Sequence, residues 1–348
     1  MSPLRLLLLT LATPVLADPP TRSDPPALDV PPIHDEAPAP RARLWALWEN
    51  DSVYTSFFDS SDRYDTNAVR LALALDTRLA RDLAVDLPSL DAIEPTRSTL
   101  GLLLGHNIYT PADLTQTALI PDDRPYAGWL FLAPFLQRRD DHTLDHLQLD
   151  LGIVGDHAYA EDLQKWVHSN FSGVPPEGWD NQLGGEFGVN LHLAKAWRFD
   201  LGQPIPGLDT QLLPDAALTL GTIFRHAQAG ATLRAGWNLP DDFGPGRADQ
   251  VPDLTPDPAI SPWSAYAFVR VQARAVQHNT FVNGSDFRDG HGVDHEPLVA
   301  RADFGLAFRL WGCLDLSYNQ SFTTDEFELQ AGGRHRGVYT LTLFLPCP

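Results

Sequence analysis

The chain has 348 residues, a formal net charge of −20 and two cysteines. This excess of acid excludes a surface built to bind nucleic-acid phosphates, and it disfavours docking on anionic lipid unless divalent cations mediate. Two cysteines exclude a cysteine-rich metal site and a multi-disulfide scaffold. The sequence has no apolar run of about 18 residues or more, so no transmembrane helix is predicted, although strands could still cross a membrane.

The N-terminus predicts export. Residues 1–17 carry one arginine, then a run of apolar residues, then small residues before Asp18. This pattern is typical of a cleaved secretory signal peptide. Residues 18–42 are rich in proline and lack periodicity, which indicates a disordered leader. We therefore expect the folded domain at 43–348.

Long segments of this domain alternate apolar and polar residues with the period of a β-strand. Over 268–275, for example, Val269 and Val271 alternate with Arg270 and Arg274. A soluble sandwich would turn the apolar face inward, whereas a transmembrane barrel turns it toward lipid and its charges toward the lumen. The same alternation is found in 146–153, 187–193, 300–310 and 339–345.

Three observations favour the barrel. The segment 262–277 is long enough to cross a bilayer when tilted, and the polar faces mix both signs of charge with small residues. Aromatic residues recur near strand ends, as interfacial girdles require. We predict an all-β fold, a twelve-stranded antiparallel transmembrane β-barrel with a short helix in an extracellular loop. The aromatic residues are Trp45, Trp48, Trp129, Trp197, Trp237, Trp263, Trp311, Tyr318 and Tyr339.

An even number of strands places both termini on the periplasmic side. Two of the resulting periplasmic loops, 76–98 and 239–261, are long and have no predicted structure. The predicted strands are 43–50, 65–75, 99–108, 126–138, 142–154, 183–199, 210–222, 226–238, 262–277, 298–310, 312–322 and 336–346.

The two cysteines lie on the last two predicted strands. Cys313 begins one strand and Cys347 ends the other, so antiparallel pairing would place them opposite each other. An exported location permits a disulfide there. Two unpaired thiols are the alternative.

A single helix, 157–169, is predicted between two strands and ends before Gly173 and two prolines. Gln164 and His168 are four residues apart, so they share one face of it. The simple interpretation is a lid whose histidine faces water. The functional one is a catalytic pair, with a neutral histidine that accepts a proton from water.

Polar clusters converge on the extracellular rim beside this helix. Asn50 and Asp51 end the first strand and Thr66 begins the second. Their hard oxygens suit Ca²⁺ rather than zinc, although an Asn-Asp pair is also a common turn. A histidine beside a cation could hydrolyse an ester. His291 and His295 are spaced for a metal but are more simply polar loop residues.

The sequence contains no Gly-x-Ser-x-Gly or His-Glu-x-x-His motif. Instead, seven segments in order resemble the outer-membrane lipid A 3′-O-deacylase family, over essentially the whole mature domain. They are Glu-Asn-Asp51, the Tyr-x-Thr-Asn stretch ending at Asn67, Ile-Tyr-Thr-Pro111, Asp-Arg-Pro-Tyr-Ala-Gly-Trp129, Gln164-x-x-x-His168, Gly-Trp-Asp-Asn-Gln182 and Asn238-Leu-Pro-Asp-Asp-Phe-Gly244.

The resemblance implies a barrel in the bacterial outer membrane that uses Ca²⁺ to remove the 3′-linked acyloxyacyl chain of lipid A. His168 would activate water with Gln164 assisting, and Asn50, Asp51 and Thr66 would surround the Ca²⁺ that stabilises the oxyanion. The site would lie at the extracellular rim, between barrel wall and helix. We expect lipid A or lipopolysaccharide as substrate, outer-membrane lipids as neighbours, no nucleic acid, and a monomer.

The sequence departs from the family at several positions. Val174 stands where an acidic metal ligand is expected, and Glu177, the nearest carboxylate, is the predicted substitute. A basic pair suited to lipid A phosphates is replaced by Gln116 and Thr117, and a glycine by Ala68. Two other functions stay open: a phospholipase with the same histidine and Ca²⁺, or a non-catalytic barrel that acts as a porin or binds lipid.

Overall fold

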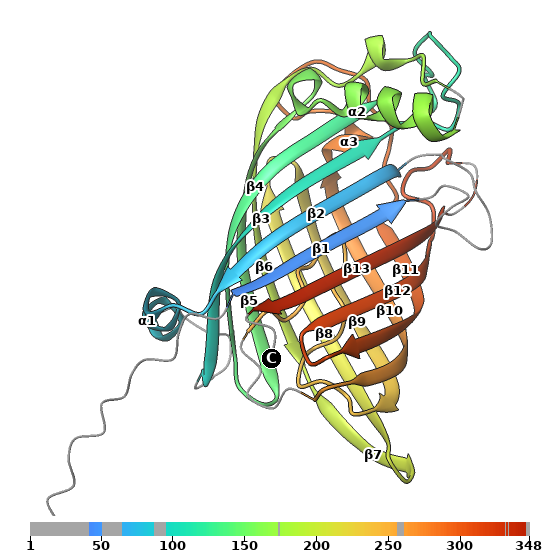
Figure 1. Cartoon of the computed structure of the whole chain (residues 1–348). Helices are drawn as coiled ribbons and strands as arrows, with labels where there is room; N and C mark the ends of the chain where they lie inside the picture. The colour runs from blue at the N-terminus through green and yellow to red at the C-terminus, as the bar shows by residue number, and fades with distance from the viewer. Residues whose placement is uncertain are drawn as a thin grey trace, which may run out of the picture. The chain divides into compact units, whose positions relative to one another are not determined.

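The computed structural model describes residues 42–50, 65–86, 95–172, 175–255, 261–330, 332 and 334–345. These residues form one antiparallel sheet (Figure 1). Its strands are β1 (Ala42–Asn50), β2 (Asp65–Leu75), β3 (Arg97–Tyr109), β4 (Ala127–Arg139), β5 (Thr143–Val154), β6 (Glu186–Trp197), β7 (Phe199–Ile205), β8 (Leu208–Gly221), β9 (Phe224–Trp237), β10 (Ser264–Asn279), β11 (Leu298–Leu310), β12 (Leu314–Thr323) and β13 (Arg334–Leu345).

The sheet closes on itself. β1 pairs with both β2 and β13, and β6 pairs with both β5 and β8. Twelve strands therefore form the wall, as predicted. The exception is β7, which was not predicted; it pairs only with the first half of β8 and extends past the end of the wall (Figure 1).

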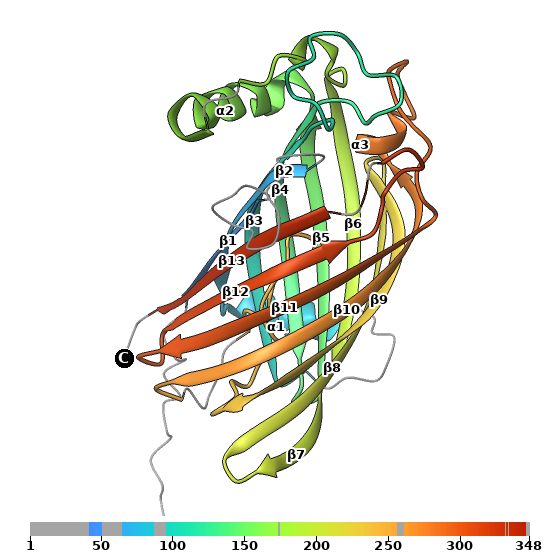
Figure 2. The same cartoon turned by 90° about the vertical axis from the view of Figure 1, so that its right-hand side faces the viewer.

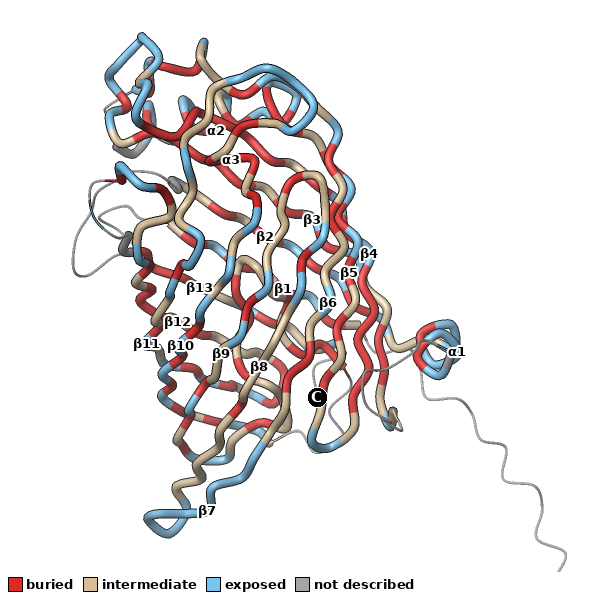
Figure 3. Tube along the Cα trace, turned by 180° about the vertical axis from the view of Figure 1, so that it is seen from behind, coloured by how far each residue is buried: buried red, intermediate tan, exposed pale blue. Residues whose placement is uncertain are grey.

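Burial along the strands is that of a membrane barrel, with apolar residues outside and charges inside (Figure 3). Leu71 and Val271 are 51% and 55% exposed, whereas Arg70 and Arg270, one position before each, are each 4% exposed. A sandwich would show the reverse. The predicted barrel is confirmed.

The prediction that all the strand-end aromatics form girdles was wrong for two of them. Trp45 and Trp129 are 2% and 1% exposed and belong to the main apolar cluster. Successive side chains of a strand point to opposite faces, and the positions of these two residues in β1 and β4 direct their side chains into the lumen. Trp48, Trp237, Trp263 and Trp311 are exposed.

The lumen is filled by residues 238–255 of the loop between β9 and β10, whose structure was not predicted. Arg70 donates to the Ala248 carbonyl at 3.1 Å, and Arg270 donates to the Pro245 carbonyl at 2.7 Å. The predicted lumenal charges pair with one another as well as with this loop: Arg270 lies 3.3 Å from Asp303. Burying these guanidinium groups requires such partners.

The helices lie outside the wall or at its ends. α1 (Arg78–Asp86) lies in the unassigned stretch 76–98, and the short α3 (Thr280–Asn283) follows β10. The predicted helix 157–169 is three pieces, η1 (Asp156–Ala158), α2 (Ala160–Val167) and the π-helical turn η2 (His168–Ser172). A further turn, η3 (Trp179–Asn181), precedes β6. None of the helices in the described residues is long and apolar enough to cross a membrane.

Only one of the two cysteines of the predicted disulfide lies in the described residues. Cys313, directly before β12, is disulfide-bonded. Cys347 lies outside the described residues. The alternative of two unpaired thiols is wrong for Cys313.

Candidate active site at the rim of the barrel

The helix α2 packs closely on the end of the wall because β4 has a glycine, Gly128, at the point of contact. We call this contact the seat of α2. A Cβ on Gly128 of β4 would lie 2.6 Å from the Ala160 Cβ and 2.8 Å from the Ala158 Cβ, closer than real Cβ contacts. His106 of β3 donates from Nε2 to the Ala158 carbonyl at 2.9 Å. Figure 2 shows the helix reaching sideways from the end of the barrel.

Gln164 is held in place from behind. The Trp179 indole N–H donates to Gln164 Oε1 at 2.8 Å, and both side chains are 1% exposed. Trp179 packs on Tyr126 with ring centroids 4.9 Å apart. Burial raises the pKa of the Tyr126 hydroxyl, which donates to the Leu114 carbonyl at 3.3 Å. The segment before β4 and the connection between β5 and β6 thus fix the orientation of Gln164.

His168 follows at the point where α2 becomes η2. Its backbone N–H donates to the Gln164 carbonyl, so the two residues lie one turn apart as the sequence predicted. The His168 side chain is 3% exposed. The histidine is therefore enclosed rather than facing water, which contradicts the simple lid interpretation.

One of the predicted oxygen ligands, Asn50, lies in the same row of the sheet as Gly128, against which α2 packs. Asn50 is opposite Asn67, Asn67 is opposite Ile108, and Ile108 is opposite Gly128. Strand spacing of about 4.8 Å puts the Cα atoms of Asn50 and Ile108 roughly 10 Å apart. Ile108 packs in one apolar cluster with Ala160 of α2.

The rest of this ligand set is only partly described. Asp51 and Val174 lie outside the described residues, and so does the side chain of Thr66, whose backbone lies at the start of β2. The exposed Glu177 is fixed through its backbone N–H to the Leu114 carbonyl at 2.8 Å. Among the described residues, no three acidic, histidine or cysteine side chains gather as metal ligands.

The segment Asp123–Trp129, one of the seven segments that resemble the family, packs beneath the site. Arg124 is 1% exposed, stacks over Tyr109 at 4.9 Å and donates from Nε to the Phe281 carbonyl at 3.1 Å. Burial raises the pKa of Asp123, even though its carboxylate accepts from the Ala112 and Arg124 N–H groups. The segment itself was visible in the sequence; that it supports α2 was not.

The two loop histidines have structural partners. His291 Nε2 donates to the Asp123 carbonyl at 2.6 Å. His295 accepts from Asn283 through Nδ1 at 2.9 Å. These bonds favour the simpler interpretation, that both are polar loop residues.

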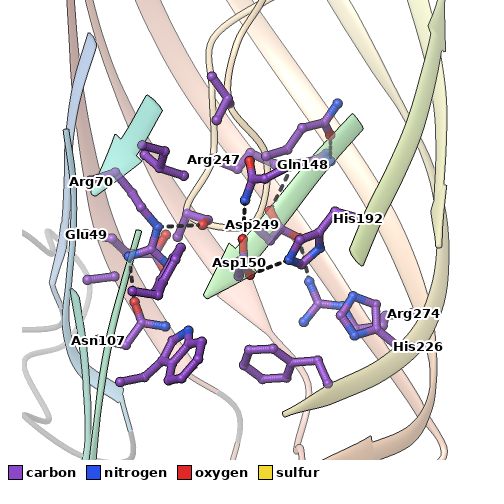
Figure 4. Close-up of a pocket in the computed structure, with 18 of the residues that line it drawn as sticks. Glu49, Arg70, Asn107, Gln148, Asp150, His192, His226, Arg247, Asp249 and Arg274 are labelled. Carbon is purple, nitrogen blue, oxygen red and sulfur yellow. Dashed lines mark hydrogen bonds and ion pairs between the residues drawn. The ribbon is translucent and has the colours of Figure 1, made fainter. Parts of the chain in front are cut away.

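A second group of titratable residues lies inside the lumen, around a cavity of about 120 Å³ (Figure 4). His192 lies 2.5 Å from Asp150 and 2.9 Å from the Thr219 hydroxyl. Arg274 pairs with Asp249 of the lumenal loop at 2.5 Å. These groups satisfy one another within the wall, away from any lipid-facing surface, so they stabilise the filled lumen.

Comparison with known proteins decides the family. The model of the family "Outer membrane protein LpxR" matches residues 5–345. The chain belongs to the LpxR family. It is an outer-membrane barrel protein.

One solved structure supports the fold. "LpxR from Salmonella typhimurium" superposes with a TM-score of 0.70 at 17% identity, and the match covers 87% of this chain and 100% of that one. The β domain of the Bordetella autotransporter BrkA gives 0.42 at 12% identity, over 87% of this chain and 98% of that one. The NalP translocator domain from Neisseria meningitidis gives 0.40 at 9%, over 87% and 88%. No curated protein matches the sequence.

Proposed function

We propose that this LpxR-family protein is a Ca²⁺-dependent esterase that removes the 3′-linked acyloxyacyl chain of lipid A. Family membership supports action on lipid A. The observation that carries the chemistry is the rim helix, where Gln164 and His168 lie one turn apart and buried, with Gln164 held by the Trp179 N–H. A buried glutamine and histidine at the rim of a membrane barrel suit the hydrolysis of a membrane lipid.

The proposed roles follow from the side chains. His168 takes the proton from the attacking water through an imidazole nitrogen, and later returns it to the leaving alcohol. Gln164 holds the water or the ring in line, since its own orientation is fixed by the Trp179 N–H. Enclosure at 3% exposure keeps bulk water away from His168 and strengthens each of these hydrogen bonds.

The donor set fits Ca²⁺ by chemistry. Asn50, Asp51 and Thr66 offer amide, carboxylate and hydroxyl oxygens from two adjacent strand ends, with Glu177 as a further carboxylate. Oxygen-only sets are those that Ca²⁺ takes. When bound, the ion would polarise the ester carbonyl.

The test uses purified protein in detergent micelles with lipid A and, separately, a glycerophospholipid. The proposal predicts release of the 3′ acyloxyacyl chain from lipid A in Ca²⁺, none in chelator, and recovery when Ca²⁺ is restored. Cleavage of the glycerophospholipid instead would establish the phospholipase alternative. A folded barrel inactive on both lipids would support the non-catalytic alternative.

A further inference from the structure

The helix α1 presents an apolar flank that the rest of the described chain leaves uncovered. It lies outside the barrel wall, near the end opposite α2 (Figures 1 and 3). Ala80 and Ala84 are 0% and 1% exposed and face the barrel, where the helix packs on β3 and β4. Leu79 and Leu83, in contrast, are 55% and 38% exposed.

The helix is firmly attached, so its orientation on the wall is fixed. Thr77 caps its first turn by accepting the Ala80 N–H at 3.1 Å. At the other end Arg138 of β4 donates to the Ala84 carbonyl at 2.6 Å. Arg138 and Leu136 continue the outward-facing positions of β4 but are each 6% exposed, because α1 covers this part of the wall.

The helix lies at the level where the outward-facing residues of the wall change from apolar to charged. Toward the middle of the strands, outward positions are leucines such as Leu132, which is 46% exposed. At the level of α1 they become charged: Arg138 lies 3.1 Å from Asp145, which lies 3.0 Å from Lys195. A change from leucine to charge on the outer face marks the edge of the hydrocarbon layer.

The exposed flank follows closely in the chain after lipid-facing residues of the wall. β2 ends in a row of exposed leucines, and its last member, Leu75, is 36% exposed and only four residues before Leu79. On a helix Leu79 and Leu83 lie about 40° apart, whereas Val85 lies about 120° around from Leu79, next to Arg81. The helix therefore has one face on the barrel, the Leu79–Leu83 flank beside it, and a remainder that carries the exposed charges Arg78, Arg81 and Asp82, with Asp82 about 60° from Leu79.

We propose that α1 is an interfacial anchor whose Leu79–Leu83 flank enters the periplasmic leaflet of the outer membrane, among phospholipid acyl chains. The position of this leucine flank, at the edge of the leucine-covered outer face of the barrel, selects lipid rather than a protein partner. The anchor would fix the depth and tilt of the barrel, and this inference is independent of the catalytic proposal.

The test places one cysteine at a time in the full chain, in vesicles, with an environment-sensitive fluorophore. The native Cys313 is disulfide-bonded and does not compete for the label. Leu79→Cys and Leu83→Cys test the flank, and Val85→Cys is the matched control, because Val85 is apolar and 74% exposed but lies on the other side of the helix. Quenchers are iodide in water and phospholipids brominated about 5–10 Å below the headgroups, the depth reached by interfacial helices.

We expect brominated lipid to quench labels at positions 79 and 83 strongly and iodide to quench them weakly, with the reverse at 85. Equal iodide quenching at all three positions would overturn the proposal. So would labels at 79 and 83 that neither agent quenches, since that would show coverage by protein. Heat-modifiable migration on gels confirms that each variant is folded.

Discussion

At the scale of single residues, the candidate site consists of two proposed catalytic side chains and of the residues that hold them in position. Gln164 and His168 could be chosen from a four-residue spacing alone, because that spacing puts two side chains on one helix face. Trp179, Tyr126 and Gly128 could not be assigned their roles, because each acts through a contact between segments far apart in sequence. The oxygen ligands remain a prediction.

The Trp179→Phe variant tests the brace behind Gln164. It keeps the ring packing but removes the N–H donor, and a hydrogen bond of this kind is worth about 0.5–1.5 kcal/mol. We expect kcat/KM for lipid A deacylation to fall roughly two- to tenfold, with the barrel still folded. Trp311→Phe, at a side chain 71% exposed, is the control and should retain full activity. Equal activities of the two variants would contradict the brace.

The Gly128→Ala variant tests the seat of α2. The added methyl would overlap Ala160 at 2.6 Å, so the helix must shift. Because a displacement of about 1 Å in a catalytic geometry can cost about a hundredfold in rate, we expect activity to fall by at least about tenfold. Gly184→Ala is the matched control, since a Cβ there meets nothing within 4 Å. A fully active Gly128→Ala protein would show that the position of α2 does not matter.

At the scale of elements, the wall was predictable and the loops were not. The period of two fixed twelve strands and their inward faces, because register in a barrel follows from which side meets lipid. Residues 238–255, which fill the lumen, have no period, and their position depends on partners on several strands. The prediction that Trp45 and Trp129 belong to the interfacial girdles was wrong, because an aromatic side chain near a strand end can point to the lipid or into the lumen.

The segment Asn238–Gly244 fastens this loop to the wall. Asp241 accepts from Arg97 at 2.6 Å, from Arg139 at 2.8 Å and from Arg198. Burial alone would raise the pKa of Asp241, but the hydrogen bonds from Arg97 and Arg198 and the charge of Arg139 outweigh it and lower the pKa. We assign this conspicuous sequence segment a structural role.

Asp241→Asn should destabilise the barrel by about 2 kcal/mol at neutral pH, as expected for losing hydrogen bonds to a charged group. The stabilisation from a lowered carboxyl pKa is complete above the unfolded value of about 3.9 and is lost as the pH falls through the folded-state pKa. The deficit of the variant in urea unfolding should therefore be constant from neutral pH down to about 5 and shrink below about 4. A deficit that does not change with pH would contradict the charge-based role.

At the scale of the whole molecule, the described part of the lumen is filled rather than open. Phe281 is 0% exposed and stacks on Tyr109 at 4.1 Å toward the end that carries α2, and residues 238–255 fill the lumen below. The charges around the cavity pair with one another. The porin alternative is therefore disfavoured by the packing.

Planar-bilayer recording tests this closure. The intact protein should show no steady conductance. Replacing residues 245–251 by a short glycine-serine linker should open measurable pores, because Arg70 and Arg270 lose partners that hold the loop. Shortening β7, which is not one of the twelve wall strands and pairs only with β8, is the control and should change nothing. Steady conductance by the intact protein would contradict the account.

The most direct test of the central claim is mass spectrometry of lipid A from Gram-negative cells that express the protein or its His168→Ala variant. The account predicts lipid A that lacks the 3′ acyloxyacyl unit with the wild-type protein, and unchanged lipid A with the variant at equal levels of folded barrel. Unchanged lipid A with both proteins, or equal loss with both, would contradict the assignment of His168 as the base of a lipid A deacylase.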